Sequence, residues 1–358
     1  MNSPLFTPSQ TVDMENSIAK KFIVITSIFQ PTKAVVLFSK MIDYQLIVVG
    51  DKKTPTNWYS QHVNYLSATQ QESLNFELAK VLPYNHYSRK MLGYLKAIQN
   101  GADFIVDTDD DNMPKKNWKF PEFEQKFECI EENKGFINIY QLYTQQKIWP
   151  RGLPLNLITT QFELEKYLSR KTCCVGIWQG LADEEPDVDA IYRLTNGRLC
   201  YFKERAPIVL GKGTLSPFNS QNTIIRSELF PLMYLPAFVT FRFTDILRGL
   251  IAQPIMWLYN YQLGFTNATV VQKRNPHDYM KDFASEIPLY QSCEKVIELV
   301  SDAISEFRDL ETNLYNAYHS LMHANIVCKD EIIALECWLN DLENIRGITK
   351  INKLNSLK

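Results

Sequence analysis

The sequence predicts an α/β protein with a central, mostly parallel sheet, helices on both faces of that sheet and a helical C-terminal extension. Two apolar runs predict the sheet, because "KKFIVITSIFQPT" (20–32) and "YQLIVVGDKKTP" (44–55) have the continuous hydrophobicity of strands buried on both faces. A third observation predicts the extension: residues 293–345 contain neither proline nor glycine and repeat apolar residues at helical spacing.

The segments between these runs have the pattern of crossover helices. "KAVVLFSKMI" (33–42) fits a helix between the first two strands. Residues 76–111 then predict a helix that ends at Pro83, a second helix that begins near Ser88 and stops at Gly101, and a third strand. This β-α-β-α-β order indicates a sheet that binds its ligands at the carboxyl ends of the strands.

The middle of the chain, 120 to about 240, is richer in proline, glycine and aromatic residues. Short runs such as "GFINIY" and "APIVLG" predict mixed or antiparallel strands between loops. We expect this half of the domain to receive a second substrate. From about 290 onward, the helical spacing predicts two or three helices.

Composition excludes several functional classes. The chain has 358 residues, a formal net charge of −2 and scattered rather than clustered basic residues, which argues against nucleic acid as a partner. Seven cysteines without CxxC pairs indicate reduced thiols. The first twenty residues lack the apolar core of a signal peptide, and no later run reaches the ~18 apolar residues of a membrane span.

The third predicted strand runs into four aspartates within five positions, "DTDDD" (107–111). Carboxylates this close repel one another, and Mg²⁺ or Mn²⁺ needs only one or two of them together with substrate phosphates. Asp109-Asp110-Asp111 has the form of a DXD element, in which Asp111 binds the metal and Asp109 contacts a ribose or, through water, the metal. A capped turn before Pro114 is the alternative interpretation.

Six motifs resemble the STELLO-type glycosyltransferases. In order from about residue 20 to 290 they read "LIVVGDKKTP", "LPYNHYSRKMLGYLKAIQNGADFIVDTDDDN", "WQGLADEEPDVDAIYRLT", "PFNSQNT", "FRFTDILRGLIAQ" and "RNPHDYMKDFASEIPLY". That family is more distantly similar to the reversibly glycosylated polypeptides, which are UDP-arabinopyranose mutases. The resemblance implies a GT-A-like fold with a Rossmann-like sheet, and binding of a nucleotide sugar. We expect a flexible tail over 1–19, the GT-A-like domain over 20–290 and the helical extension over 291–358.

The resemblance also implies the residues of the donor site. Strand-end residues would hold a uridine, unless they are simply turn residues. Two cations at the start of a helix would meet a diphosphate, unless they are a solvated basic pair. His277 would be a late metal or diphosphate ligand, unless it is structural. The residues expected around the nucleotide are Thr26, Asp51, Lys52, Arg89, Lys90 and Asp109; those expected around Mn²⁺ or Mg²⁺ are Asp109, Asp111 and His277.

By the same resemblance, Asp245 looks like the acidic residue that GT-A enzymes present to the acceptor hydroxyl. A carboxylate there would take the hydroxyl proton during attack on the anomeric carbon. The alternative is an acid that only stabilises a helix start. For the acceptor itself, the loop "GLADEEPDVDAIYRLT" and the motif "PFNSQNT" offer sugar-binding groups, unless the loop is merely solvated and its tryptophan lies in the core. The expected acceptor residues are Trp178, Asp187, Asp189, Asn219 and Asn222.

These observations predict a metal-dependent glycosyltransferase that moves a sugar from a nucleotide diphosphate sugar, with UDP as the expected nucleotide, to an unidentified glycan, protein or lipid. A UDP-sugar mutase and a non-catalytic scaffold on the same fold are the two alternatives, and homo-oligomerisation is left open. We expect a soluble, cytoplasmic protein, or one in the Golgi lumen if the natural chain carries a membrane anchor as the plant members do.

Overall fold

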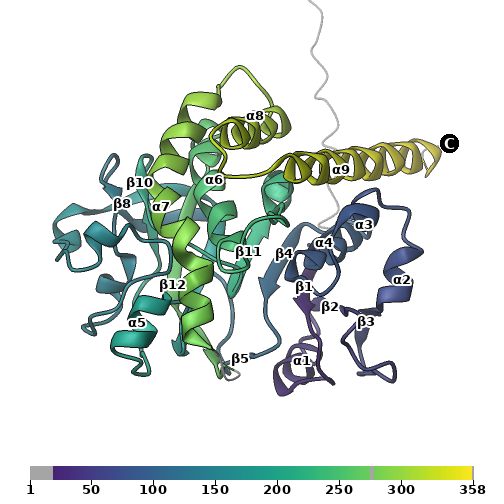
Figure 1. Ribbon diagram of the computed structural model, residues 1–358, viewed down its shortest axis with the longest axis horizontal. Helices are drawn as coiled ribbons and strands as arrows, with labels where there is room; N and C mark the ends of the chain where they lie inside the picture. Colours follow the sequence, from purple (N-terminus) through teal and green to yellow (C-terminus); the bar gives the residue numbers. More distant parts are fainter. Residues whose placement is uncertain (1–18, 275–277, 357–358) are drawn as a thin grey trace, which may run out of the picture.

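The computed structural model describes residues 19–274 and 278–356, and within them ten strands form one large sheet (Figure 1). In sheet order these strands are β3 (Val63–Leu66), β2 (Tyr44–Val49), β1 (Lys21–Thr26), β4 (Phe104–Thr108), β11 (Asn222–Arg226), β8 (Leu168–Glu184), β6 (Glu124–Ile130), β9 (Ile208–Leu210), β12 (Gln262–Gln272) and β5 (Asn112–Pro114). Two short strands, β7 (Gly135–Phe136) and β10 (Thr214–Leu215), pair separately. The predicted α/β class is confirmed.

The first half of the sheet is parallel, as the two apolar runs predict. β1 pairs in parallel with both β2 and β4, and β2 pairs in parallel with β3. Along β1, Phe22 and Val24 pack in the core cluster that includes helix α4 (Lys90–Gln99), whereas Ile23 and Ile25 pack in the cluster that includes α1 (Lys33–Phe38). Helices therefore cover both faces, and the apolar runs are continuous because neither face meets water.

The second half of the sheet is mixed. β11 is antiparallel to both β4 and β8, and β12 runs parallel to the long strand β8. As a result, the carboxyl end of β4 lies beside the start of β11, and the chain on either side of that junction contributes to one cavity. Two short helices complete the parallel half, α2 (Ala68–Glu72) and α3 (Leu78–Val81), and α5 (Ala190–Thr195) follows β8.

The C-terminal helices pack on the sheet domain rather than forming a separate body. α7 (Tyr279–Ala303) lies against α6 (Thr244–Leu258), α8 (Leu310–His323) packs on α7, and α9 (Lys329–Ser356) crosses α3 and α4 (Figure 1). The expected boundary at 290/291 falls inside the continuous helix α7, so the extension has no separate start there. Among the described residues, no helix is long and apolar enough to cross a bilayer.

Candidate active site

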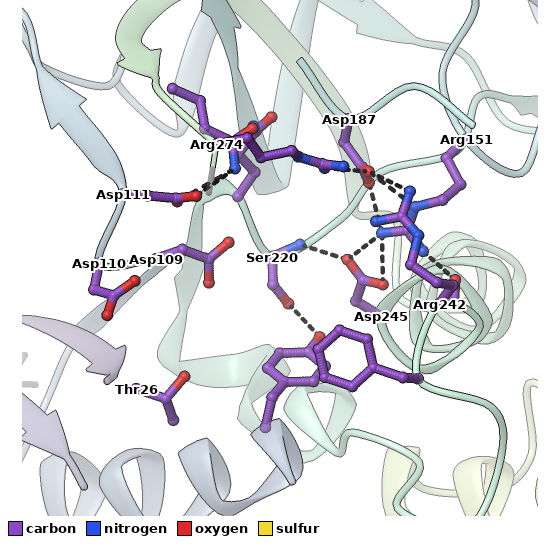
Figure 2. Close-up of a pocket in the computed structure, with 14 residues that line it drawn as sticks. Thr26, Asp109, Asp110, Asp111, Arg151, Asp187, Ser220, Arg242, Asp245 and Arg274 are labelled. Atoms are coloured by element: carbon purple, nitrogen blue, oxygen red, sulfur yellow. Dashed lines mark hydrogen bonds and ion pairs between the residues drawn. The ribbon is translucent and has the colours of Figure 1, made fainter. Parts of the chain in front are cut away.

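A cavity opens where β1 and β4 end, and its first wall consists of acidic side chains (Figure 2). Asp109, Asp110 and Asp111 follow β4 and line this cavity, as does Thr26 at the end of β1. Asp110 also accepts a hydrogen bond from Ser27 Oγ, and both oxygens of Asp111 accept from Gln272 Nε2, at 3.2 and 3.1 Å. The predicted crowding of carboxylates at a strand end is therefore present.

The ionised forms of these carboxylates are disfavoured. Burial raises the pKa of Asp109 to about 7, and Asp111 adds to this rise while Lys90 opposes it. Burial likewise raises the pKa of Asp110 to about 6, and burial together with the charge of Asp110 raises the pKa of Asp111. Negative charge gathers on this wall without enough positive charge to balance it.

A divalent cation would supply that balance. Among the residues that the structure describes, no group of three or more His, Cys, Asp or Glu side chains is arranged to hold a metal ion. Mg²⁺ and Mn²⁺ do not need such a cage when a substrate contributes phosphate oxygens, because one or two carboxylates then suffice. Asp109 and Asp111 fit this role by chemistry and position, and His277 lies outside the described residues.

The opposite wall carries three arginines, Arg151, Arg242 and Arg274 (Figure 2). Arg151 binds Asp187 through two hydrogen bonds, Nε to Oδ1 at 2.8 Å and Nη2 to Oδ2 at 2.7 Å. The other two guanidinium groups lie farther from Asp187, at 3.8 Å for Arg242 and 3.6 Å for Arg274. Burial alone would raise the pKa of Asp187, but Arg151 and Arg242 lower it to about 2. Asp187 thus lines the cavity as an ionised partner of arginines.

Asp245 lies in the first turn of α6, as the sequence predicts, and its carboxylate lines the cavity. Arg151 Nη2 donates to both of its oxygens, at 2.9 and 3.0 Å, and the Ser220 N–H donates at 3.3 Å. The same Arg151 therefore holds Asp187 and Asp245 side by side. Any proton that Asp245 accepts must approach through lone pairs that these donors leave open.

A second pocket adjoins the first at four shared residues, Thr26, Tyr87, Asp110 and Phe241. Asp51 and Arg89 line this pocket, at the ends of β2 and of the turn before α4. Arg89 is almost fully buried, with Nε donating to Gln71 Oε1 at 2.7 Å. The two pockets therefore adjoin, and each can take one part of a single ligand.

The two expected lysines have other contacts. Lys90 is fully buried, and its three donors reach Asp107 at 2.8 Å, the Thr108 carbonyl at 2.7 Å and Asp109 at 2.9 Å. It therefore holds the aspartate turn from behind and has no donor left for a diphosphate, contrary to expectation. Lys52 lies 3.7 Å from the centre of the Tyr84 ring and lines neither pocket.

The expectation that Trp178 stacks on a sugar is wrong. Its indole is fully buried on β8, packs edge-on against Phe127 at 5.0 Å and donates from Nε1 to the Glu122 carbonyl at 3.2 Å. Gly264 on the neighbouring strand lies directly against this ring, since a Cβ there would lie 2.3 Å from it. Trp178 is a core residue, which is the alternative that the sequence left open.

Three other expected acceptor residues also have structural partners. Asp189 caps α5 by accepting from the Tyr192 N–H at 2.9 Å, and it accepts from Trp149 Nε1 at 2.7 Å. Asn222 is fully buried between Trp118 and Thr269. The Asn219 carbonyl oxygen Oδ1 accepts from the Gln221 N–H at 2.9 Å, so it shapes the turn that carries Ser220 and Gln221 into the cavity.

Sequence reasoning missed the arginine wall. Arg242 and Arg274 lie within two of the quoted motifs, "FRFTDILRGLIAQ" and "RNPHDYMKDFASEIPLY", but the site residues predicted from those motifs were Asp245 and His277. Arg151 lies in "IWPRGLPLN", outside those motifs. Only the fold brings these three distant segments together.

Comparison with known proteins agrees with the sequence motifs. Residues 242–353 match the family model of STELLO glycosyltransferases. The chain is 27% identical over 362 residues to "Probable glycosyltransferase STELLO1" of Arabidopsis thaliana, covering 95% of this chain and 46% of the relative. It is 30% identical over 275 residues to "Probable glycosyltransferase STELLO2" of the same plant, covering 72% and 36% respectively. The chain thus spans less than half the length of these curated relatives.

Proposed function

Because the chain is a STELLO-type relative, we propose that it is a glycosyltransferase that uses a nucleotide diphosphate sugar, with UDP as the expected nucleotide, on a GT-A-like fold. The observation that carries this proposal is the carboxylate wall of Asp109, Asp110 and Asp111 at a strand end, inside a cavity that also contains Asp245 and adjoins a second pocket. A cavity of this kind suits a ligand with a nucleoside at one end and a sugar at the other.

Each part of the donor can be assigned to one of the two adjoining pockets. The pocket that contains Asp51 would take the nucleoside, with Thr26 and Asp51 near the uridine. The diphosphate would then lie at the residues that both pockets share, and the sugar would lie between the aspartates and the arginine wall. In this arrangement Arg151 holds the side chains of Asp187 and Asp245 beside the sugar.

Asp109 and Asp111, with His277 as a further candidate, would hold Mn²⁺ or Mg²⁺. When bound, such an ion supplies Lewis-acid stabilisation to the negative charge of the leaving diphosphate. Asp245 would accept the proton of the acceptor hydroxyl as that oxygen attacks the anomeric carbon. Arg151 would position Asp245 for this step by donating to both of its carboxylate oxygens.

A thermal-shift screen of nucleotide sugars, with and without Mn²⁺, tests the proposal. Stabilisation by a UDP-sugar only when Mn²⁺ is present supports a metal-dependent donor site, and absence of binding in every combination supports the scaffold alternative. Conversion of the bound UDP-sugar into an isomer without acceptor identifies a mutase. Transfer to a glycan, protein or lipid identifies a glycosyltransferase and names its acceptor class.

A further inference from the structure

The loop between Tyr234 and α6 carries part of the cavity wall. Phe241 lines both pockets and Arg242 lines the first, and Asp245 follows them in the first turn of α6. Phe241 is 54% exposed although it packs edge-on against Tyr87, with 5.5 Å between ring centres. An exposed ring at the edge of a cavity, such as that of Phe241, keeps its position only if the backbone of its own loop is held in place.

Glu331 on α9 holds this loop from the side away from the cavity. Its carboxylate is fully buried and accepts from the Ala237 N–H at 2.9 Å and the Phe238 N–H at 2.8 Å. It also accepts from the Tyr234 hydroxyl. Hydrogen bonds between a carboxylate and backbone N–H groups are charge-assisted, so they are stronger than neutral ones and fix the backbone rather than a side chain.

α7 holds the other end of the loop. Thr240 Oγ1 donates to the Ser285 carbonyl at 2.6 Å, and the Arg242 N–H donates to Ser285 Oγ at 3.2 Å. Arg242 Nε donates to the buried Glu286 carboxylate at 2.8 Å. The segment from Ala237 to Arg242 is therefore held at two places, by α9 at Ala237 and Phe238 and by α7 at Thr240 and Arg242.

We propose that Glu331 is a positioning residue of the cavity: through the backbone of Ala237 and Phe238 it sets the place of Phe241 and Arg242 at the ligand. This inference rests on the proposed function for the identity of the ligand, and it makes the C-terminal helices part of the site. Glu331 touches neither pocket, so its effect on a ligand must pass through the loop.

Asp341 provides a matched control. It lies ten residues further along the same helix, is almost fully buried and also accepts two backbone N–H bonds, from Glu77 and Leu78, both at 2.9 Å. The segment that it anchors is the start of α3, which lines neither pocket. If the role of Glu331 were purely structural, Glu331→Gln and Asp341→Asn would both destabilise the fold, and they would affect ligand affinity equally.

The experiment compares the full-length wild type, Glu331→Gln and Asp341→Asn by thermal melting, amide hydrogen exchange and calorimetry with UDP and Mn²⁺. We expect Glu331→Gln to speed exchange across residues 239–243, beyond the two amides that it contacts, by at least tenfold. It should weaken UDP binding by at least fivefold. Asp341→Asn should lower the melting temperature comparably while leaving both quantities within twofold.

Unchanged exchange over 239–243 in Glu331→Gln, or equal effects of the two variants on that segment or on UDP affinity, would overturn the inference. If the wild type binds no UDP under any condition, the proposed function fails, and the exchange comparison still decides whether Glu331 positions the loop. Tyr234→Phe removes one of the three donors to Glu331 and gives a milder change in the same direction should Glu331→Gln not fold.

Discussion

Replacing Asp111 by asparagine removes one charge from the acidic wall with little change in volume. The side-chain oxygen of asparagine can still accept from Gln272 Nε2, which donates to both oxygens of Asp111 in the wild type. The variant therefore isolates the charge of one carboxylate from its contribution to the shape of the cavity.

The expected effects on binding and on stability have opposite signs. A carboxylate that directly ligates a divalent ion contributes a tenfold change or more, so metal-dependent UDP binding should weaken by about 1.4 kcal/mol or above. The free energy of unfolding of the metal-free protein should not fall. The pKa of Asp111 is raised by burial and by Asp110, so its ionised form is less favourable in the folded chain than in the unfolded one, and a neutral side chain relieves this cost at pH 7.

Calorimetry with UDP and Mn²⁺ at pH 7, together with urea unfolding in chelator, measures both quantities. Asp110→Asn is the matched control, because it removes the same charge from the neighbouring residue, whose side chain accepts a hydrogen bond from Ser27. We expect it to weaken UDP binding by less than about threefold, well under the tenfold assigned to a ligand. Equal losses in the two variants would indicate general electrostatics, and unchanged affinity in Asp111→Asn would remove this residue from the metal site.

Substitutions at Asp245, Arg151 and Asp189 test the roles of three further residues. Asp245→Asn should leave UDP-sugar affinity within a few-fold while turnover falls by roughly two orders of magnitude or more, measured by steady-state kinetics with a working acceptor; full turnover would leave Asp245 only a partner of Arg151. Arg151→Met should lower the free energy of unfolding, measured in urea, by about 3–5 kcal/mol, because two buried carboxylates lose their cation. The control Arg205→Met, whose partner Glu165 is mostly exposed, should lower it by about 0–1 kcal/mol. Similar costs for the two arginine variants would contradict the buried network. Asp189→Ala should cost about 1 kcal/mol as a lost helix cap, without changing UDP affinity. Because burial raises the pKa of Asp189 to about 6, the wild type should lose stability as pH rises from about 4 to 6, and Asp189→Asn should flatten that part of a melting-temperature series; an unaltered slope would contradict this.

Local sequence patterns predicted the parallel half of the sheet because the information is local there. Strands buried on both faces must be apolar throughout, so β1 and β2 can be recognised without their neighbours. The placing of β11 between β4 and β8 depends on contacts between segments about 50 to 120 residues apart, which no window of sequence contains. The expected boundary at 290/291 lies inside α7, because this helix continues through Pro288 and its packing on α6 offsets the cost of the proline.

The same distinction between local and distant information explains the site. The place of Asp109 and Asp111 in a cavity could be predicted, because carboxylates so close in the sequence repel one another wherever the chain places them. The arginine wall could not, because Arg151, Arg242 and Arg274 meet only after β8, α6 and β12 have assembled. Trp178 was predicted to bind a sugar because an indole ring can stack on one. Its actual contacts depend on the position of Trp178 in β8, which is buried on both faces there.

The two walls of the cavity differ in how completely their charges are balanced, and this difference bears on the order of binding. On the arginine wall the carboxylates are already paired, as the lowered pKa of Asp187 reflects. On the aspartate wall, burial raises the pKa values of Asp109 and Asp110, and the positive charge of Lys90 does not offset this rise. A diphosphate arriving alone would add negative charge where it is already in excess. We therefore expect the nucleotide to bind with its cation or after it, and the affinity for UDP without a divalent ion to be too weak to measure at concentrations that saturate the site in its presence.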